Sequence, residues 1–282
     1  MIEALNLTRR YGENTAVDSL SFTLPRGGIC GFLGPNGAGK STTMNMMTGC
    51  LGITAGDFLI DGVSIRQDPL AVRRMIGYLP EQPPLYGEMT PLEYLNFAAE
   101  LRGLRGDEAR EAVADAMSRT GLEDSRDRVI SNLSKGYKQR VGLAQAILGT
   151  PPVLIFDEPT VGLDPAQIIE IRALIRDLAR EHTVILSTHI LSEVRELCSR
   201  VLIISRGKLM ADGTVEELEA ASATGDTSVL VRGEDVARLS ELCAREDIPI
   251  LGTSGVSDTL ESIFIRLTSE DAGKEEPDES DI

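Results

Sequence analysis

Residues 34–42 read Gly34-Pro35-Asn36-Gly37-Ala38-Gly39-Lys40-Ser41-Thr42, and this stretch decides the fold. It matches the pattern G-x-x-x-x-G-K-[ST] at every required position. The apolar run at residues 29–33 precedes it and shows no alternation, which predicts a strand buried on both faces. Residues 40–50 follow it with good helix content. A strand, a glycine-rich turn and a helix in this order predict a phosphate-binding loop and make a chance match a poor alternative.

The residue types of this loop suit a triphosphate. Glycine lets the backbone curve closely around an anion, so that several N–H groups point inward. The N-terminal end of the following helix adds positive potential. We expect Lys40 to bridge the terminal phosphates and the Ser41 hydroxyl to take a place on Mg²⁺. The expected ATP-binding residues of the loop are Asn36, Gly37, Ala38, Gly39, Lys40, Ser41 and Thr42.

A second site is expected at Asp157 and Glu158, which follow the apolar run at residues 153–156. A buried strand of a parallel sheet ends at the edge where ligands bind. Asp157 is expected to hold Mg²⁺ through its water shell, because Mg²⁺ gives up water reluctantly. Glu158 is expected to orient and polarise a water in line with the γ-phosphate. Two solvated acids at a helix or loop start are the alternative, and the phosphate loop upstream argues against it.

The rest of the chain alternates predicted strands with predicted helices. Strands are expected at residues 3–7, 19–24, 183–187 and 201–204, and helices between about residues 91 and 148 and at 168–180. This order predicts an α/β fold with a mostly parallel sheet. The block at about 90–150 is expected to insert as a helical subdomain.

The sequence changes character beyond about residue 221. Strands are expected at 227–231 and 249–251 and helices at 234–245 and 257–267, which together predict a small C-terminal α/β appendage at 221–268. Residues 269–282 carry seven acidic groups and one lysine, so a disordered, solvated tail is expected there.

Charge and hydropathy restrict the partners. The formal net charge is -16 and no block of Lys or Arg breaks it, so nucleic acid is not expected as a partner. No apolar run approaches the roughly 20 residues that a membrane-spanning helix needs. A role in transport would therefore require a separate membrane protein.

One further motif narrows the class of nucleotide-binding protein. Leu133-Ser134-Lys135-Gly136-Tyr137 resembles the signature motif Leu-Ser-Gly-Gly-Gln of the ABC ATPases. Lys135 replaces the first glycine and Tyr137 the glutamine, whereas Ser134 and Gly136, which would touch the γ-phosphate, are kept. We interpret the departure as a subfamily variant that keeps the function.

The same family resemblance extends to other motifs. Tyr11 resembles the aromatic residue that stacks on adenine, a contact that would not strongly exclude GTP. Asp164 lies in a segment that resembles the D-loop, and His189 resembles the switch histidine that contacts the γ-phosphate. The glutamine that the family uses to meet Mg²⁺ or the attacking water corresponds to Glu81 or to Gln82, with a slight preference for Gln82.

The resemblance covers about residues 2–220 and carries several expectations. It implies a P-loop NTPase core (1–220) with a mostly parallel sheet, an antiparallel β subdomain and an inserted helical subdomain. It implies an ATPase that closes as a dimer around two MgATP molecules. It also implies a multi-span permease partner and a cytoplasmic place on the inner face of the cell membrane. Residues 260–267 resemble the C-terminal end of stand-alone exporter ATPases of the drug, lipid, polysaccharide or gliding-motility type.

Two other classes of protein remain as alternatives. ABC ATPases of DNA repair, chromosome handling or translation usually carry long coiled-coil insertions, tandem ATPase units or a basic face. This chain has a single phosphate loop, no long heptad insertion and an acidic charge balance. A P-loop kinase or GTPase is disfavoured by residues 134–140 and by His189.

Overall fold

The computed structural model describes residues 1–222, 236–245 and 260–269. Its contacts divide the chain into two compact units, Met1–Thr214 and Val215–Ile282. The predicted domain boundary at residues 220 and 221 falls inside helix α8 (Val215–Ser222) and stays a prediction.

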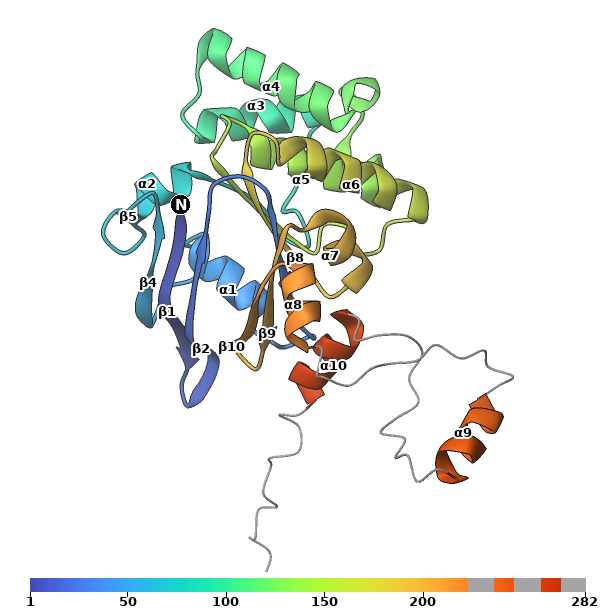
Figure 1. Cartoon of the computed structure of the whole chain (residues 1–282). Helices are drawn as coiled ribbons and strands as arrows, with labels where there is room; N and C mark the ends of the chain where they lie inside the picture. Colours follow the sequence, from blue (N-terminus) through green and yellow to red (C-terminus); the bar gives the residue numbers. More distant parts are fainter. Residues whose placement is uncertain (223–235, 246–259, 270–282) are drawn as a thin grey trace, which may run out of the picture. The chain divides into compact units, whose positions relative to one another are not determined.

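The predicted phosphate loop follows one strand of the larger sheet of the first unit, a sheet of which β8, β9 and β10 are labelled in Figure 1. The six strands of this sheet lie in the order β10-β9-β3-β8-β7-β6, and all are parallel except β10 at the edge. The strands are β3 (Ile29–Leu33), β6 (Ile76–Leu79), β7 (Val153–Asp157), β8 (Thr183–Thr188), β9 (Arg200–Ser205) and β10 (Lys208–Gly213). The prediction of an α/β fold with a mostly parallel sheet is confirmed.

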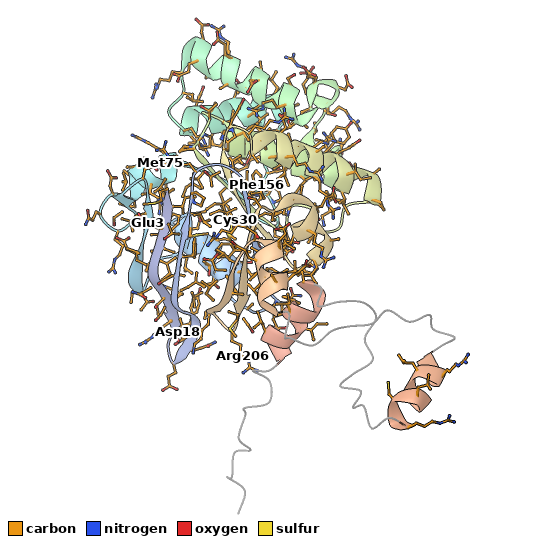
Figure 2. The ribbon with its side chains drawn as sticks, in the orientation of Figure 1. Glu3, Asp18, Cys30, Met75, Phe156 and Arg206 are labelled. Atoms are coloured by element: carbon orange, nitrogen blue, oxygen red, sulfur yellow. The ribbon has the colours of Figure 1, made fainter. Side chains whose placement is uncertain are left out.

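Strand β7 is apolar from Val153 to Phe156 because it contributes to two cores. Leu154 and Phe156 of β7 pack into one hydrophobic cluster, whereas Ile155 between them packs into the other. Phe156 and Cys30, labelled in Figure 2, lie in the interior of the unit and are buried. A strand that is covered on both faces has no solvent side and therefore no polar alternation.

The first core lies between the parallel sheet and a smaller antiparallel sheet. Helix α1 (Lys40–Met47) buries Met44, Met46 and Met47 in this core. In Figure 1 this helix lies between the two sheets. The antiparallel sheet has the order β2-β1-β4-β5 and consists of β1 (Ile2–Tyr11), β2 (Asn14–Leu24), β4 (Ala55–Ile60) and β5 (Val63–Ser64). The antiparallel β subdomain expected from the family resemblance is present.

The second core joins the other face of the parallel sheet to a group of helices. Helices α3, α4 and α5 lie within the range 90–150 that was predicted for a helical subdomain. Figure 1 shows α3 and α4 at the top of the view, beyond α5 and α6. The α-helices of the first unit other than α1 are α2 (Pro69–Arg74), α3 (Pro91–Leu101), α4 (Gly106–Thr120), α5 (Lys135–Ile147), α6 (Pro165–Leu178) and α7 (Leu191–Leu197).

Some elements were not predicted. The predicted set of strands ends at residues 201–204, yet β10 follows and pairs with β9 in antiparallel fashion. Strands β4, β5 and β6 and helix α2 were also missed.

The second unit is described only by its helices. These are α8, α9 (Val236–Arg245) and α10 (Leu260–Ser269). Helix α9 falls in the range predicted as a helix at 234–245, and α10 overlaps the range predicted at 257–267 but ends later, at Ser269. The predicted strands at 227–231 and 249–251 lie outside the described residues, as does the acidic tail from residue 270 onward. Among the described helices, none has the length and apolar character to cross a membrane.

Candidate nucleotide-binding site

The loop between β3 and α1 has the backbone conformation that its glycines predict. Gly37 and Gly39 have φ angles of 80° and 100°, in the left-handed region that side chains disfavour. A Cβ atom at Gly39 would lie 2.8 Å from the carbonyl oxygen of Ala16. The loop can therefore take this path only with glycine at this position.

The helix that follows the loop begins without a cap from any side chain. Gly39 is the N-cap residue of α1, and the first turn of the helix carries no acidic residue. The first N–H groups of a helix have no intrahelical partner and carry partial positive charge. The start of α1 therefore has the properties of an anion-binding site.

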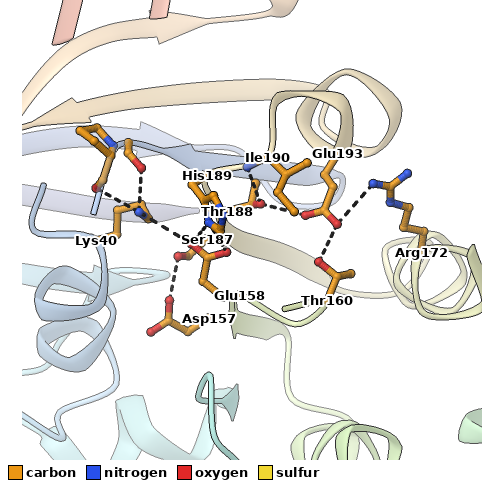
Figure 3. Close-up of polar contacts among 12 residues, drawn as sticks. Lys40, Asp157, Glu158, Thr160, Arg172, Ser187, Thr188, His189, Ile190 and Glu193 are labelled. Atoms are coloured by element: carbon orange, nitrogen blue, oxygen red, sulfur yellow. Dashed lines mark hydrogen bonds and ion pairs between the residues drawn. The ribbon is translucent and has the colours of Figure 1, made fainter. Parts of the chain in front are cut away.

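Lys40 brings a buried positive charge to the same place. Its Nζ donates hydrogen bonds to the carbonyl oxygens of Gly34 at 2.7 Å and Pro35 at 3.2 Å, and it lies 3.7 Å from Oε1 of Glu158 (Figure 3). Burial lowers the pKa of Lys40, and the nearby carboxylates of Glu158 and Asp157 oppose this shift. The loop thus holds an ammonium group whose hydrogen bonds to the two carbonyl oxygens could be replaced by hydrogen bonds to phosphate oxygens.

Two carboxylates lie near Lys40 at the end of β7. Asp157 is buried, and its Oδ1 accepts a hydrogen bond from the Ser187 hydroxyl at 2.7 Å. Glu158 follows with a φ angle of 49°, and its N–H donates to the Ser187 carbonyl at 3.1 Å. A non-glycine residue with positive φ is uncommon and strained. The turn therefore directs Glu158 out of the strand at a conformational cost.

His189 completes the polar cluster from the end of β8. Its Nδ1 lies 3.0 Å from Oε2 and 3.1 Å from Oε1 of Glu158. Since a carboxylate only accepts, this contact assigns the hydrogen to Nδ1. The imidazole is partly exposed, with 46% of its side-chain surface accessible. Glu158 thus lies between a lysine and a histidine, three residues that were predicted from separate motifs.

A cavity of about 450 Å³ opens over these residues, within the size range of small-molecule sites. It contains every predicted loop residue from Asn36 to Thr42, together with Glu158 and His189. Its lining consists of Ala16, Asn36, Gly37, Ala38, Gly39, Lys40, Ser41, Thr42, Glu81, Glu158, Val161 and His189.

The two candidates for the family's glutamine position lie differently. Glu81 lines the cavity at the phosphate loop. Gln82 lines a separate pocket of about 410 Å³, to which Glu81 also contributes. The structure therefore brings Glu81, and not the slightly preferred Gln82, to the cavity.

Besides Gln82 and Asp157, four predicted residues are not among those that line the cavity. Ser134 is the N-cap residue of α5 and Gly136 lies in its first turn, while Asp164 is the N-cap residue of α6. The Tyr11 ring is exposed, and the Arg9 guanidinium lies 4.6 Å from its centre. Contacts of these four residues with a nucleotide stay predictions.

Two lining residues, Ala16 and Val161, were not predicted from the sequence. Val161 follows Glu158 by one tight turn, in which its N–H donates to the Glu158 carbonyl, so its nearness to the acid could have been inferred. Ala16 belongs to β2 of the antiparallel sheet. No local signal in the sequence connects that strand with the phosphate loop.

The residues present fit a magnesium ion bound together with phosphates. Among the described residues, no group of three or more His, Cys, Asp or Glu side chains could hold a metal ion alone. Mg²⁺ is usually bound by one or two carboxylates, several waters and the phosphates of the substrate. The buried Asp157 at the strand end and Ser41 in the cavity lining supply that kind of incomplete ligand set.

Comparison with known proteins agrees with this geometry. A family model described as ABC transporter matches residues 17–161. The chain is 36% identical to the ABC transporter ATP-binding protein YhcH of Bacillus subtilis over 96% of each protein. It is 38% identical to the bacitracin transport ATP-binding protein BcrA of Bacillus licheniformis, over 78% of this chain and 71% of that protein.

A solved structure has a similar fold. It is the dimeric structure of MJ0796, a bacterial ABC transporter cassette. The two chains are 27% identical and superpose with a TM-score of 0.69, over 76% of this chain and 98% of that one. With a matching family model and a relative that it covers almost completely, this chain belongs to the ABC transporter family, as one of its ATP-binding and ATP-hydrolysing subunits.

Proposed function

We propose that two copies of this chain bind and hydrolyse MgATP between them and thereby drive export through a separate multi-span permease. The observation that carries this proposal is the separation of two predicted parts of one site. Lys40, Glu158 and His189 border one cavity, whereas Ser134 and Gly136 are not among its lining residues. Residues suited to a γ-phosphate that do not reach their own chain's phosphate loop can serve the loop of a second chain. The similar cassette MJ0796, whose solved structure is a dimer, supports this arrangement.

The proposed site divides the chemistry among the residues of the phosphate loop and the strand ends. Lys40 gives up its hydrogen bonds to the Gly34 and Pro35 carbonyls and binds the terminal phosphates. Ser41 and Asp157 would hold Mg²⁺, which when bound neutralises negative charge on the phosphates. Glu158 accepts a hydrogen bond from the attacking water and polarises it towards the γ-phosphate.

His189 and the remaining predicted residues have supporting roles in the proposal. The Nδ1–H of His189 holds the Glu158 carboxylate, and its partly exposed ring can contact the γ-phosphate. Tyr11 stacks on adenine, Glu81 or Gln82 meets the metal or the water, and Asp164 contacts the second copy. Loss of the γ-phosphate removes the charge that both chains bind, so hydrolysis would let the dimer open.

The proposed place of action is the inner face of the cell membrane, which the chain would reach from the cytoplasm through its permease. The name of BcrA, a bacitracin transport ATP-binding protein, supports a role in transport. Nucleic acid is not proposed as a partner because the chain has a net charge of -16. We also propose that the ATPase domain ends near residue 220 and that an appendage and an acidic tail follow.

The test is to purify the chain together with the multi-span protein encoded beside its gene. We expect a stable complex whose ATPase activity rises with a transported substrate, and Lys40→Ala in the chain should abolish transport without dissociating the complex. Failure to associate, together with ATPase activity that DNA or RNA stimulates instead, would contradict the proposal. Lys208→Ala, which changes an exposed lysine of the edge strand β10, is the matched control.

A further inference from the structure

Glu193 is the most deeply buried acidic side chain near the cavity, although the cavity lining does not include it. It lies on α7, and only 1% of its side-chain surface is accessible. A buried carboxylate is costly unless hydrogen bonds and an opposite charge compensate it. The fold therefore has to supply Glu193 with partners.

Three donors satisfy both oxygens of Glu193 (Figure 3). Oε1 accepts from the Thr160 hydroxyl at 2.6 Å and from the Arg172 guanidinium at 3.3 Å. Oε2 accepts from the Thr188 hydroxyl at 2.8 Å. Only 14% of the Arg172 side-chain surface is accessible, so this ion pair is largely removed from water.

The two threonines belong to the two segments that carry Glu158 and His189. Thr160 lies in the turn after Glu158, in which the Val161 N–H donates to the Glu158 carbonyl at 3.2 Å. Thr188 precedes His189, and its hydroxyl also accepts a hydrogen bond from the Ile190 N–H at 3.0 Å. Glu193 therefore accepts hydrogen bonds from the residue two positions after Glu158 and from the residue directly before His189.

We propose that Glu193 is a positioning residue for ATP hydrolysis, because it binds the turn after Glu158 and the loop at His189 to one another. It fixes the distance between these segments and thereby keeps the His189 imidazole on the Glu158 carboxylate. The inference rests on the proposed roles of Glu158 and His189 in hydrolysis. Glu193 itself touches neither the nucleotide nor the attacking water.

Helix α7 also contains a matched control for this inference. Glu196 pairs with Arg172 at 2.6 Å and with Arg176, so it shares a partner with Glu193. Its side chain is 44% exposed, and within the described part of the chain no hydrogen bond joins it to Thr160 or Thr188. Glu196→Gln removes the same charge from the same helix without disturbing the two segments.

The experiment measures kcat and KM for ATP on the purified full-length chain. Glu193→Gln keeps the side chain's shape but replaces one acceptor by a donor, and we expect kcat to fall at least about tenfold. KM should change by less than about twofold, since ground-state binding of ATP is untouched. Glu196→Gln should keep the kcat of the unchanged protein. A loss of kcat in Glu196→Gln equal to that in Glu193→Gln would overturn the inference.

Thr188 gives an independent test should Glu193→Gln fail to fold. Thr188→Ser retains the hydroxyl and should retain kcat, whereas Thr188→Val retains the shape and should lose as much kcat as Glu193→Gln. Equal activity of the two Thr188 variants would overturn the inference, whatever Glu193→Gln does.

A double substitution separates positioning from a purely structural role. If Glu193 acts through His189, Glu193→Gln should cause little further loss of kcat in a chain that already carries His189→Ala. A full, additive loss in the double variant would overturn the inference. If His189→Ala and Glu158→Gln alone leave hydrolysis unchanged, the proposed function fails as well, and the two failures are thereby distinguished.

Discussion

Two helices of the first unit begin in opposite ways. Helix α3 begins with a capping box, in which the Thr90 hydroxyl accepts from the Glu93 N–H and the Glu93 carboxylate accepts from the Thr90 N–H. Helix α1 begins after Gly39 with no side-chain cap and no acid in its first turn. The chain satisfies the N–H groups of one helix start by itself and leaves the other for a ligand.

The difference shows how stability and function are distributed in this unit. A capped helix start contributes to folding, since its orphan N–H groups find partners inside the protein. An uncapped start beside a buried lysine contributes little to folding and gains its partner only when an anion binds. The positive φ of Glu158 likewise contributes nothing to folding, because this strained conformation places a carboxylate at the site. Substitutions in the two regions should therefore affect different measurements.

The largest effect is expected at the phosphate loop. Lys40→Ala removes the cation that would bind the terminal phosphates, so ATPase activity should fall by at least about a hundredfold. The temperature of unfolding without nucleotide should not fall by a comparable amount, because burial already disfavours the charged lysine. Steady-state phosphate release measures the loss of ATPase activity, and thermal unfolding measures the stability without nucleotide. Nearly normal turnover would refute the assignment of the loop.

A smaller effect on ATP binding is expected at Gly39 but not at Gly62, although both glycines have positive φ angles. Gly39 has φ 100° and would place a Cβ 2.8 Å from the Ala16 carbonyl, whereas Gly62 has φ 81° and no atom within 4 Å of such a Cβ. We expect Gly39→Ala to weaken ATP binding at least about tenfold because the loop must move. Gly62→Ala should lower the free energy of unfolding by about 1 kcal/mol and leave binding intact. Calorimetric titration with ATP that gave equal affinities would remove the distinction.

The smallest effect is expected at the capped helix and should appear in stability alone. Thr90→Ala removes the capping box and should cost about 1 kcal/mol of folding free energy. For a unit of this size that loss corresponds to a fall of roughly 2–4 °C in the temperature of unfolding. Turnover below the unfolding transition should stay unchanged, and Thr90→Ser should restore the stability. A kcat that fell with Thr90→Ala would show that the two regions are not separate.

The sequence predicted the parts of the fold whose signals are local. Strands β3, β7, β8 and β9 were found because strands with two buried faces are continuously apolar. Strand β6 was missed because it is short and contains Gly77, where a Cβ would lie 2.0 Å from the Ala146 carbonyl. That glycine is explained by the end of α5, a neighbour far away in the sequence. Strand β10 was missed because an edge strand with few buried residues has no apolar run.

In the site, too, the residues with a local sequence signal were predicted and those that depend on distant neighbours were not. Lys40, Glu158 and His189 were predicted from three short motifs, and the structure brings them together. Glu193 was not predicted because a lone acid in an amphipathic helix has the pattern of a solvated residue. Its burial depends on Thr160 and Arg172, which meet it only in the folded sheet and helices. Motifs identify residues that meet a ligand, whereas residues that hold those residues in place are found from contacts.

The central claim is that MgATP is bound by the phosphate loop of one copy and by residues Ser134 and Gly136 of another. Light scattering on Glu158→Gln tests it most directly, since this variant should bind MgATP and hydrolyse it very slowly. We predict a monomer without nucleotide and twice that mass with MgATP, and a return to the monomer when Ser134→Arg is added. A Glu158→Gln chain that binds MgATP and keeps the monomer mass would contradict the claim.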